Sequence, residues 1–313
     1  MKTVKKTMLT APALVLLCAL FITACPQPFE NKPNVPSGPD PNLKIENGVL
    51  KGYNGTPSGT LVIPENVTEI DVNAFFECKG INGTVVFPAN LKTIGAGAFY
   101  SCSNIDGFDF SQCKQLTLIK GLAFAKCTKI RTVNLPASLE TIKGDAFEDC
   151  TELKELTVKA GGPLIADKNI IYTSDKTTIL CCAPNEESVN LPKDLKEMAE
   201  AAFKACTNLK TVKLPDSVET LGFQAFFRCT GLTGTVVLPA NLKIIDIGVF
   251  CLCSNVDCFD LSRCTALTSI GNLAFSLCKA DAVFKVKDNS VGSAIKIMLI
   301  ERGIKESQIQ KVK

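Results

Sequence analysis

Cysteine is the residue type through which this sequence could do chemistry. The 313 residues include 16 cysteines and no histidine. Without histidine, the chain has neither the base of a Ser/His/Asp or Cys/His catalytic site nor a histidine-ligated metal site. The carboxylates are scattered and never form two repeated inward pairs, so a glycosidase site is not indicated. We therefore expect no enzymatic activity, no catalytic residue and no cofactor, because an enzyme here would need an exposed, activated thiol.

One group of cysteines is dense enough to suggest a metal site, but its spacing argues against one. The group consists of Cys251, Cys253, Cys258 and Cys264, with one, four and five intervening residues instead of the paired CxxC spacing that holds zinc. We expect no metal.

Three cysteines are candidates for thiols that reach the solvent. Alternation around Phe259 predicts that Cys258 points outward, at the place that Gly107 holds in an earlier copy of the same segment. Cys181 and Cys182 lie outside the repeat described below and are expected to be partly exposed.

Eight cysteines recur at a fixed place in a repeat, three positions after a phenylalanine that follows Ala in seven copies and Val249 in one. Successive phenylalanines are 24, 25 and 23 residues apart, then 56, then 23, 24 and 25. A period in the low twenties is typical of a solenoid, in which each coil packs only on its neighbours. The eight pairs, all expected in the core, are Phe75/Cys78, Phe99/Cys102, Phe124/Cys127, Phe147/Cys150, Phe203/Cys206, Phe226/Cys229, Phe250/Cys253 and Phe275/Cys278.

Each coil is predicted to contain three short extended pieces rather than a long helix. Val212 and Leu214 alternate with Thr211 and Lys213, the pattern of a half-buried strand, and Pro215 ends it. The next aliphatic pair begins the opposite wall, and the AFxxC segment returns the chain. We expect its Phe to fill the coil and its Cys to act as a compact buried hydrophobe. Disulfides between coils are the alternative in an oxidising envelope, although a regular repeat supplies one equivalent thiol per coil and no obvious pairs.

The repeated string LPxxLxxIxxxAFxxCxxLxxVxL covers roughly residues 60–287 and resembles the BspA-like, or Treponema pallidum-type, leucine-rich repeat family. The resemblance implies a leucine-rich-repeat solenoid of the α/β horseshoe class, dominated by β-structure, with a strand on the concave wall and little helix on the convex one. We expect about eight AFxxC coils with a cap at each end. Members of this family are typically surface or secreted proteins linked to adhesion.

A block of coils is duplicated within the repeat. Residues 83–127 and 234–278 are identical at 27 of 45 positions with a constant offset of 151. In each copy a serine, Ser111 or Ser262, stands where most other coils have the proline that ends the strand. Duplication of whole coils is easy in a solenoid, because its stability is a sum of local and neighbour terms.

Two segments depart from the repeat within the solenoid domain predicted for residues 43–287. Residues 43–63 are predicted to form an N-terminal hairpin cap with Asn47-Gly48 in its turn. Residues 161–191 account for the interval of 56 and are predicted to be an atypical coil with a hairpin.

Residues 288–313 are predicted to form a C-terminal capping helix and tail. Ser290 can cap the helix and Gly303 can end it. The apolar side of this helix is predicted to consist of Ile295, Leu299 and Ile300.

The N-terminal residues have the features of a bacterial export signal. Residues 1–24 contain three lysines, then an apolar run, then small residues. The segment Ile22-Thr23-Ala24-Cys25 resembles a lipobox, which implies cleavage before Cys25 and lipidation of its thiol. The alternatives are an ordinary signal peptide and a transmembrane helix, for which an apolar run of about 15 residues is short. Residues 25–42 are rich in proline and are predicted to be an extended tether after the lipid. We expect a membrane-anchored protein of the bacterial cell envelope that is exposed at the cell surface.

Charge gives no case for a nucleic-acid partner. The formal net charge of +3 disappears when Lys2, Lys5 and Lys6 leave with the signal, because 31 basic and 31 acidic residues then remain. No basic run exists that could neutralise a phosphate backbone.

The remaining candidate site is the outward face of the predicted concave strands. One column of this face is rich in Thr, which also favours strands for structural reasons alone, and a second column varies between coils. The face has no aromatic anchor, so we expect binding to be spread over area. The candidate residues are Asp109, Thr132, Asn134, Thr157, Lys159, Asn190, Thr211, Lys213, Asp260 and Lys285. We expect a cell-surface lipoprotein that binds a protein of the host extracellular matrix or of another bacterium; the alternative is a structural or periplasm-facing envelope lipoprotein without a host ligand.

Overall fold

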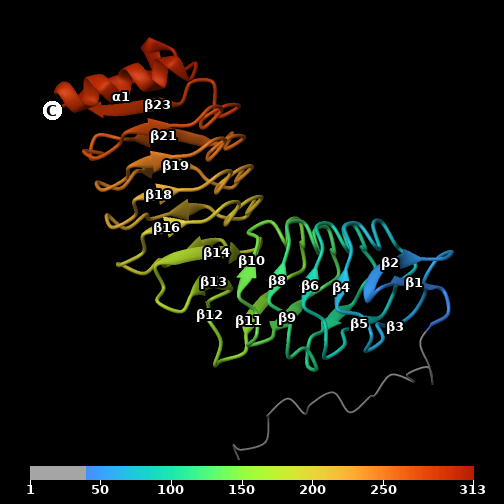
Figure 1. The fold of residues 1–313 in the computed structure, drawn as a ribbon. Helices are drawn as coiled ribbons and strands as arrows, with labels where there is room; N and C mark the ends of the chain where they lie inside the picture. Colours follow the sequence, from blue (N-terminus) through green and yellow to red (C-terminus); the bar gives the residue numbers. More distant parts are fainter. Residues whose placement is uncertain (1–39) are drawn as a thin grey trace, which may run out of the picture. The chain divides into compact units, whose positions relative to one another are not determined.

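A computed structural model describes residues 40–313, which wind into a solenoid with two walls of short strands and an edge of return turns (Figure 1). The predicted signal sequence, Cys25 and the tether up to residue 39 lie outside the described residues. Within the described range, no helix combines the length and the apolar character that a bilayer span requires.

The first wall, here called the strand wall, is built from the predicted strand of each coil. Its neighbouring strands pair in parallel, and the wall is divided into four sheets, in the orders β3-β5-β7, β11-β9, β15-β17 and β19-β21-β23-β24. The strands are β3 (Leu61–Val62), β5 (Thr84–Val86), β7 (Gly107–Asp109), β9 (Thr132–Leu135), β11 (Glu155–Val158), β15 (Ser188–Val189), β17 (Thr211–Val212), β19 (Gly234–Val237), β21 (Val256–Asp260) and β23 (Val283–Lys287).

The second wall, here called the opposite wall, is the more continuous one, although each coil gives it only two residues. Its strands are β4 (Glu69–Ile70), β6 (Thr93–Ile94), β8 (Leu118–Ile119), β10 (Thr141–Ile142), β16 (Glu197–Met198), β18 (Thr220–Leu221), β20 (Ile244–Ile245) and β22 (Ser269–Ile270). The N-terminal hairpin extends one part of this wall to a six-stranded sheet. The segment of residues 161–191, here called the insert, extends the other part to a seven-stranded sheet.

The AFxxC turns, here called the return edge, stack through backbone hydrogen bonds between coils. The Phe99 N–H donates to the Ala123 carbonyl and the Ser101 N–H to the Ala125 carbonyl, both at 2.8 Å. The residue before the repeat cysteine is left-handed in all eight coils, with φ between 56° and 65°. Non-glycine residues rarely adopt this conformation, so the ladder of hydrogen bonds compensates for local strain.

The repeat phenylalanines form two stacks inside the solenoid. All eight rings are buried, with at most 4% of each residue exposed. Phe75, Phe99, Phe124 and Phe147 stack with centroid distances of 5.1, 5.9 and 5.3 Å, and Phe203, Phe226, Phe250 and Phe275 with distances of 5.1, 5.3 and 5.7 Å. Stacked rings of this kind add attraction beyond the burial of their area.

The repeat cysteines do more than fill space, which the sequence did not predict. In six coils the Sγ–H donates to the carbonyl oxygen of the repeat phenylalanine one coil earlier, at 2.9–3.2 Å; the donors are Cys102, Cys127, Cys150, Cys229, Cys253 and Cys278. Cys78 and Cys278, in the first and last coils, are only partly buried, because each has a neighbouring repeat coil on one side only.

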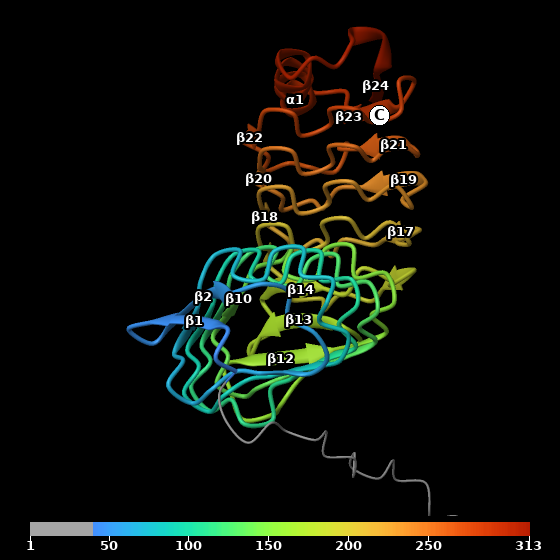
Figure 2. The same ribbon diagram turned by 90° about the vertical axis from the view of Figure 1, so that its right-hand side faces the viewer.

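The insert forms an antiparallel plate between two separate hydrophobic cores. Its strands are β12 (Leu164–Asp167), β13 (Ile170–Thr173) and β14 (Thr178–Cys182), which lie next to one another in Figure 2. Ile171 and Cys181 belong to the first core, whereas Ile170, Tyr172 and Cys182 belong to the second. Both faces of the plate are therefore buried, and β14 starts the seven-stranded sheet by pairing with β16.

The N-terminal hairpin consists of β1 (Leu43–Glu46) and β2 (Val49–Tyr53). Asn47 and Gly48 both have positive φ, at 50° and 79°, as a two-residue hairpin turn requires. β2 pairs in parallel with β4, so the hairpin covers the open edge of the first coil.

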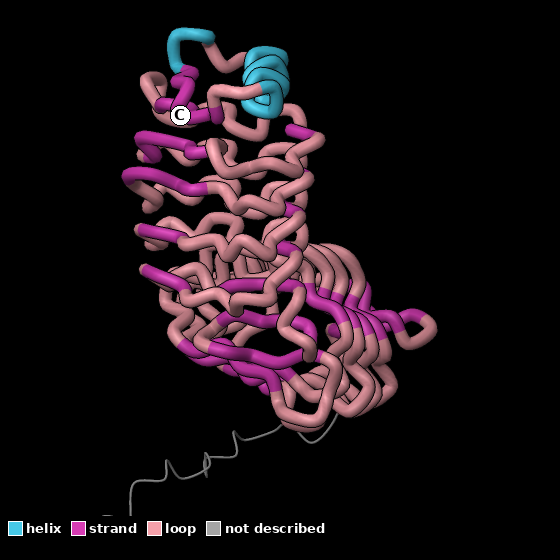
Figure 3. The backbone as a smooth tube through the Cα atoms, turned by 90° about the vertical axis from the view of Figure 1, so that its left-hand side faces the viewer, coloured by secondary structure: helices cyan, strands magenta, loops and turns pink. Residues whose placement is uncertain are grey.

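The C-terminal end differs from the sequence prediction in its cap, its apolar side and its tail. Helix α1 (Ser290–Glu301) is capped by Asn289, whose Oδ1 accepts from the Gly292 N–H at 2.9 Å, because Ser290 is already helical. Of the three predicted apolar residues, Ile295 and Leu299 are buried in the core, whereas Ile300 is 43% exposed. The tail continues into a short 3₁₀ helix (Glu306–Gln308) and β24 (Ile309–Val312), which pairs in parallel with β23 (Figure 3).

Candidate protein-binding surface

The ten candidate residues lie on or directly after strands of the strand wall, and none is buried. The wall is interrupted between β7 and β9, between β11 and β15 and between β17 and β19, so the ten do not form one continuous sheet face. Four of them come together at the first interruption. The other six, Thr132, Asn190, Thr211, Lys213, Asp260 and Lys285, lie elsewhere on the wall.

A cleft of about 680 Å³ lies at the interruption between β7 and β9. Its lining includes the four candidates Asp109, Asn134, Thr157 and Lys159. The remaining lining combines the polar side chains of Lys114, Ser111 and Ser138 with the apolar residues Phe108, Phe110, Cys113, Leu135, Pro136, Ala137 and Val158. Phe108, Phe110, Cys113, Leu135 and Pro136 are buried, so the accessible surface of the cleft is formed mainly by the polar side chains together with Ala137 and Val158.

The duplicated block shows what is special about this interruption. In the second copy, β21 pairs with the following strand β23, and Asp260 lies in register with Lys285. In the first copy, the equivalent strand β7 pairs with β5, and among the described residues no ladder joins it to β9. The edge of β21 that faces the following strand is therefore paired with β23, whereas, in the part of the chain that the structure describes, the equivalent edge of β7 has no strand partner and borders the cleft.

Asn134 is held in place by the neighbouring strand. The Thr157 hydroxyl donates to Asn134 Oδ1 at 2.5 Å, and the two residues are in register on β9 and β11. This bond uses the amide oxygen of Asn134 and leaves its donating nitrogen for a ligand.

Asp109 also stabilises the turn that follows β7, which the sequence did not predict. Its Oδ1 accepts from the Ser111 N–H at 2.8 Å, and Asp260 does the same for Ser262 at 2.9 Å. Proline has no N–H at this position in the other coils, so replacing it with serine creates a donor that needs an acceptor. The pairing of Asp with Ser two residues later was the available signal.

The three cysteines that were expected to reach the solvent are buried, which corrects that prediction. Cys258 is 7% exposed, Cys182 5% and Cys181 not at all. Cys258 is in register with the exposed Thr235, but the adjoining strands β19 and β23 cover its thiol. Cys181 and Cys182 face the two cores on either side of the plate.

The dense cysteine group is likewise buried. Burial raises the pKa of Cys251, Cys253 and Cys258, and raises that of Cys264 to about 12. Thiols with raised pKa values are poor nucleophiles at neutral pH. Between residues 40 and 313, no three histidine, cysteine, aspartate or glutamate side chains converge as ligands for a metal ion.

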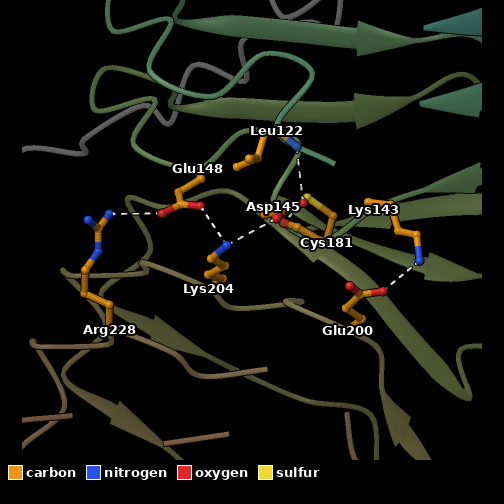
Figure 4. Close-up of polar contacts among 9 residues, drawn as sticks. Leu122, Lys143, Asp145, Glu148, Cys181, Glu200, Lys204 and Arg228 are labelled. Atoms are coloured by element: carbon orange, nitrogen blue, oxygen red, sulfur yellow. Dashed lines mark hydrogen bonds and ion pairs between the residues drawn. The ribbon is translucent and has the colours of Figure 1, made fainter. Parts of the chain in front are cut away.

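The return edge carries a cluster of partly buried ion pairs that sequence reasoning missed (Figure 4). Lys204 Nζ lies 3.3 Å from Asp145 Oδ2 and 3.2 Å from Glu148 Oε2, and Arg228 binds both Glu148 and Asp149. The paired residues lie in or next to three AFxxC turns, and the two partners of each pair are 56 to 80 positions apart in sequence. The signal was the opposite charge at the variable positions of AFEDC, AFKAC and AFFRC.

The return edge also carries the exposed aromatic side chains that the strand wall lacks. Phe76 is 47% exposed and Phe223 38%. Exposed aliphatic residues accompany them on this edge, namely Val72, Ile247, Leu273 and Leu277.

The comparison with protein families gives a match over most of the described chain. A sequence model for the family described as "BspA type Leucine rich repeat region" matches residues 50–174 and 178–291, in six copies. A comparison with curated proteins finds no match.

Two solved structures show the same fold. The Pneumococcal vaccine antigen PcpA is similar over 88% of this chain and 80% of its own, with a TM-score of 0.54 and 22% identity. A leucine-rich repeat protein from Eubacterium ventriosum ATCC 27560 is similar over 77% of this chain and 82% of its own, with a TM-score of 0.51 and 17% identity. The predicted leucine-rich-repeat solenoid is thereby confirmed.

Proposed function

Because this chain belongs to the BspA-type leucine-rich repeat family, we propose that its solenoid is a non-enzymatic scaffold for binding another protein and that the cleft between β7 and β9 is its binding site. The observation that carries the proposal is the convergence of Asp109, Asn134, Thr157 and Lys159 on one cleft. Phe108 of β7, next to Asp109, packs against Phe99 and Phe124 of the Phe stack, and β9 pairs with β11, so these strands hold the site in a preorganised form.

The lining of the cleft favours an extended segment of a protein partner. Ala137 and Val158, which are partly exposed, provide apolar contact, and the Asn134 amide can donate to a backbone carbonyl. Lys114 and Lys159 are exposed at the cleft and can pair with acidic side chains of the partner. The partner that we propose is a protein of the host extracellular matrix or of another bacterium.

A binding experiment with matched variants tests the site. The full chain is titrated against immobilised host matrix proteins and against whole bacteria. Lys159→Glu should weaken binding at least tenfold. Lys213→Glu is the matched control, because Lys213 is an exposed lysine that also directly follows a strand of the same wall but lies outside the cleft. Equal effects of the two variants would contradict the assignment to the cleft, and the absence of saturable binding to any of these surfaces would contradict the proposed adhesion.

The second part of the proposal is that the protein is a lipoprotein displayed at the cell surface. Its support is the sequence Ile22-Thr23-Ala24-Cys25 and the proline-rich segment that follows. Metabolic labelling with a fatty-acid analogue should mark the wild-type chain and not the Cys25→Ser variant. External protease should digest the protein on intact cells; a chain that is digested only after lysis would contradict surface display.

A further inference from the structure

The column of repeat cysteines changes its contact at one coil, the coil that follows the insert. Elsewhere a repeat cysteine donates to the phenylalanine carbonyl of the coil before it, as Cys229 does to Phe203 at 3.0 Å. The coil before Cys206 is the insert, which has no repeat phenylalanine. The Sγ of Cys206 instead lies 4.0 Å from the carbonyl oxygen of Ala183.

Cys182 occupies the place of the missing phenylalanine. Its N–H donates to the Ala202 carbonyl at 2.8 Å, as the Phe203 N–H donates to the Ala225 carbonyl at 2.8 Å in the next coil. The Cys182 side chain therefore enters the second core where a phenyl ring would otherwise lie. It also leaves Phe203 as the first ring of the second stack.

The two thiols meet at one carbonyl oxygen. Cys182 Sγ lies 3.4 Å from the Ala183 oxygen that Cys206 Sγ also approaches. Within residues 40–313, the Ala183 oxygen is the one carbonyl oxygen that lies within hydrogen-bonding range of two cysteine thiols. Burial, followed by the contact with Cys206, raises the pKa of Cys182 well above its usual value, which agrees with two thiols packed together in an apolar core.

We propose that Cys182 and Cys206 are joined by a disulfide bond when the chain folds under oxidising conditions. In six regular coils the column thiol instead faces a phenylalanine carbonyl that no other thiol contacts. The insert supplies the Cys182 thiol, which shares a carbonyl oxygen with the column thiol of Cys206.

The reaction is a thiol–disulfide exchange. Two S–H bonds are lost and one S–S bond is formed, and two electrons and two protons pass to the disulfide of the oxidant, which becomes two thiols. Oxidised glutathione can serve as that oxidant in solution, and a thiol–disulfide oxidoreductase can serve in an oxidising compartment. Because both thiols are buried in the folded chain, the exchange takes place during folding, before the core closes.

The bond would close a loop over residues 183–205 and tie the plate to the first AFxxC turn of the second core. This is the point at which the Phe stack is interrupted between Phe147 and Phe203. A covalent link here replaces the ring contact that joins successive coils elsewhere.

Peptide mapping tests the proposal directly. The full chain is refolded in a buffer of oxidised and reduced glutathione, unfolded in the presence of an alkylating reagent and digested. We expect a cross-linked peptide pair containing Cys182 and Cys206, with the other cysteines of the described range alkylated. Alkylation of both residues, or a bond from either of them to a different cysteine, would overturn the proposal. Fragmentation of the linked pair distinguishes Cys182 from its neighbour Cys181.

Variants provide an independent readout. Oxidation should raise the denaturant midpoint of the wild-type chain, and Cys182→Ser should abolish this shift. Cys229→Ser is the matched control, because it removes a buried column thiol that lies outside the pair, and the shift should persist. A shift that persists in Cys182→Ser would contradict the proposal; if that variant does not fold, the mapping of the wild-type chain still decides.

Discussion

The Cys150 thiol donates a hydrogen bond to the Phe124 carbonyl, which lies 3.1 Å away and one coil earlier. The same carbonyl accepts the Cys127 N–H at 3.2 Å, so one oxygen joins the turn of its own coil to the turn of the next. A hydrophobic residue of equal size could fill the space but could not make this bond. The repeat therefore selects cysteine for its donor as well as for its volume.

Replacing Cys150 with alanine should lower the free energy of unfolding by about 1–3 kcal/mol, because both a buried hydrogen bond and some packing volume are lost. Cys251→Ala is the control, since the Cys251 thiol is buried but donates no hydrogen bond to another described residue. Denaturant unfolding of the two variants measures the difference. Equal losses would show that the sulfur acts only by filling space.

Truncating a ring in the stack should have a larger effect. Phe147→Ala should lower the free energy of unfolding by about 3–5 kcal/mol, because Phe147 is 1% exposed and stacks on Phe124. Phe76→Ala, on the exposed side of the return edge, should lower it by less than about 1 kcal/mol. A loss below about 1 kcal/mol for Phe147→Ala would contradict its place in the core.

The bond from Ser111 to Asp109 can be tested with a double-mutant cycle. Asp109→Ala should lower the free energy of unfolding by about 1 kcal/mol, because the Ser111 N–H loses its acceptor. Ser111→Pro removes that N–H and restores the residue found in most coils. In the Ser111→Pro background, Asp109→Ala should therefore have almost no effect. An equal effect in both backgrounds would mean that Asp109 stabilises the fold in some other way.

The ion pairs of Lys204 should contribute more than an exposed pair. Lys204→Met should lower the free energy of unfolding by about 1–3 kcal/mol, because Asp145 is left partly buried without its cation and Glu148 keeps only Arg228. The control is Lys143→Met, which removes a half-exposed ion pair with Glu200. This variant should change the free energy of unfolding by about 0–1 kcal/mol. Urea unfolding of both variants at low salt measures the difference.

The pH dependence of the Lys204 contribution follows from its titration. Burial by itself would lower the Lys204 pKa, but Glu148 and Asp145 outweigh it and raise the pKa above the usual 10.5. A group whose pKa is higher in the folded state stabilises the fold fully below its unfolded value and loses that contribution as the pH rises through the folded value. The difference in unfolding free energy between the wild type and Lys204→Met should therefore be constant near neutral pH and shrink above about pH 10.5. A difference that shrinks on acidification from pH 8 to pH 6 would contradict this.

Local patterns in the sequence were sufficient to predict the solenoid. The spacing of Phe and Cys predicted about eight AFxxC coils with caps, which agrees roughly with a strand wall of ten strands. The alternation around Val212 predicted a strand face, and Asn47-Gly48 predicted a hairpin that β1 and β2 form. These features depend on neighbouring residues or on a strict period, which a single sequence displays.

Features that depend on contacts between distant coils could not be predicted in this way. Alternation placed Cys258 on the outward face, but it could not reveal that β19 and β23 cover the thiol. The cleft at Asn134 exists because β7 and β9 do not pair, although the equivalent strands of the duplicated block do. The ion pairs of Lys204 require coils on both sides of the insert to meet, and no spacing rule reports that.

In the plate formed by the insert, two consecutive residues pack into different hydrophobic cores. Ile170 and Ile171 are consecutive in sequence, yet each packs into a different core. A destabilising substitution in this short segment should therefore weaken the packing of two sets of coils at once. A substitution in an ordinary coil should mainly weaken the packing of the coils beside it. The segment that looks least like the repeat is thus the one whose side chains belong to both hydrophobic cores.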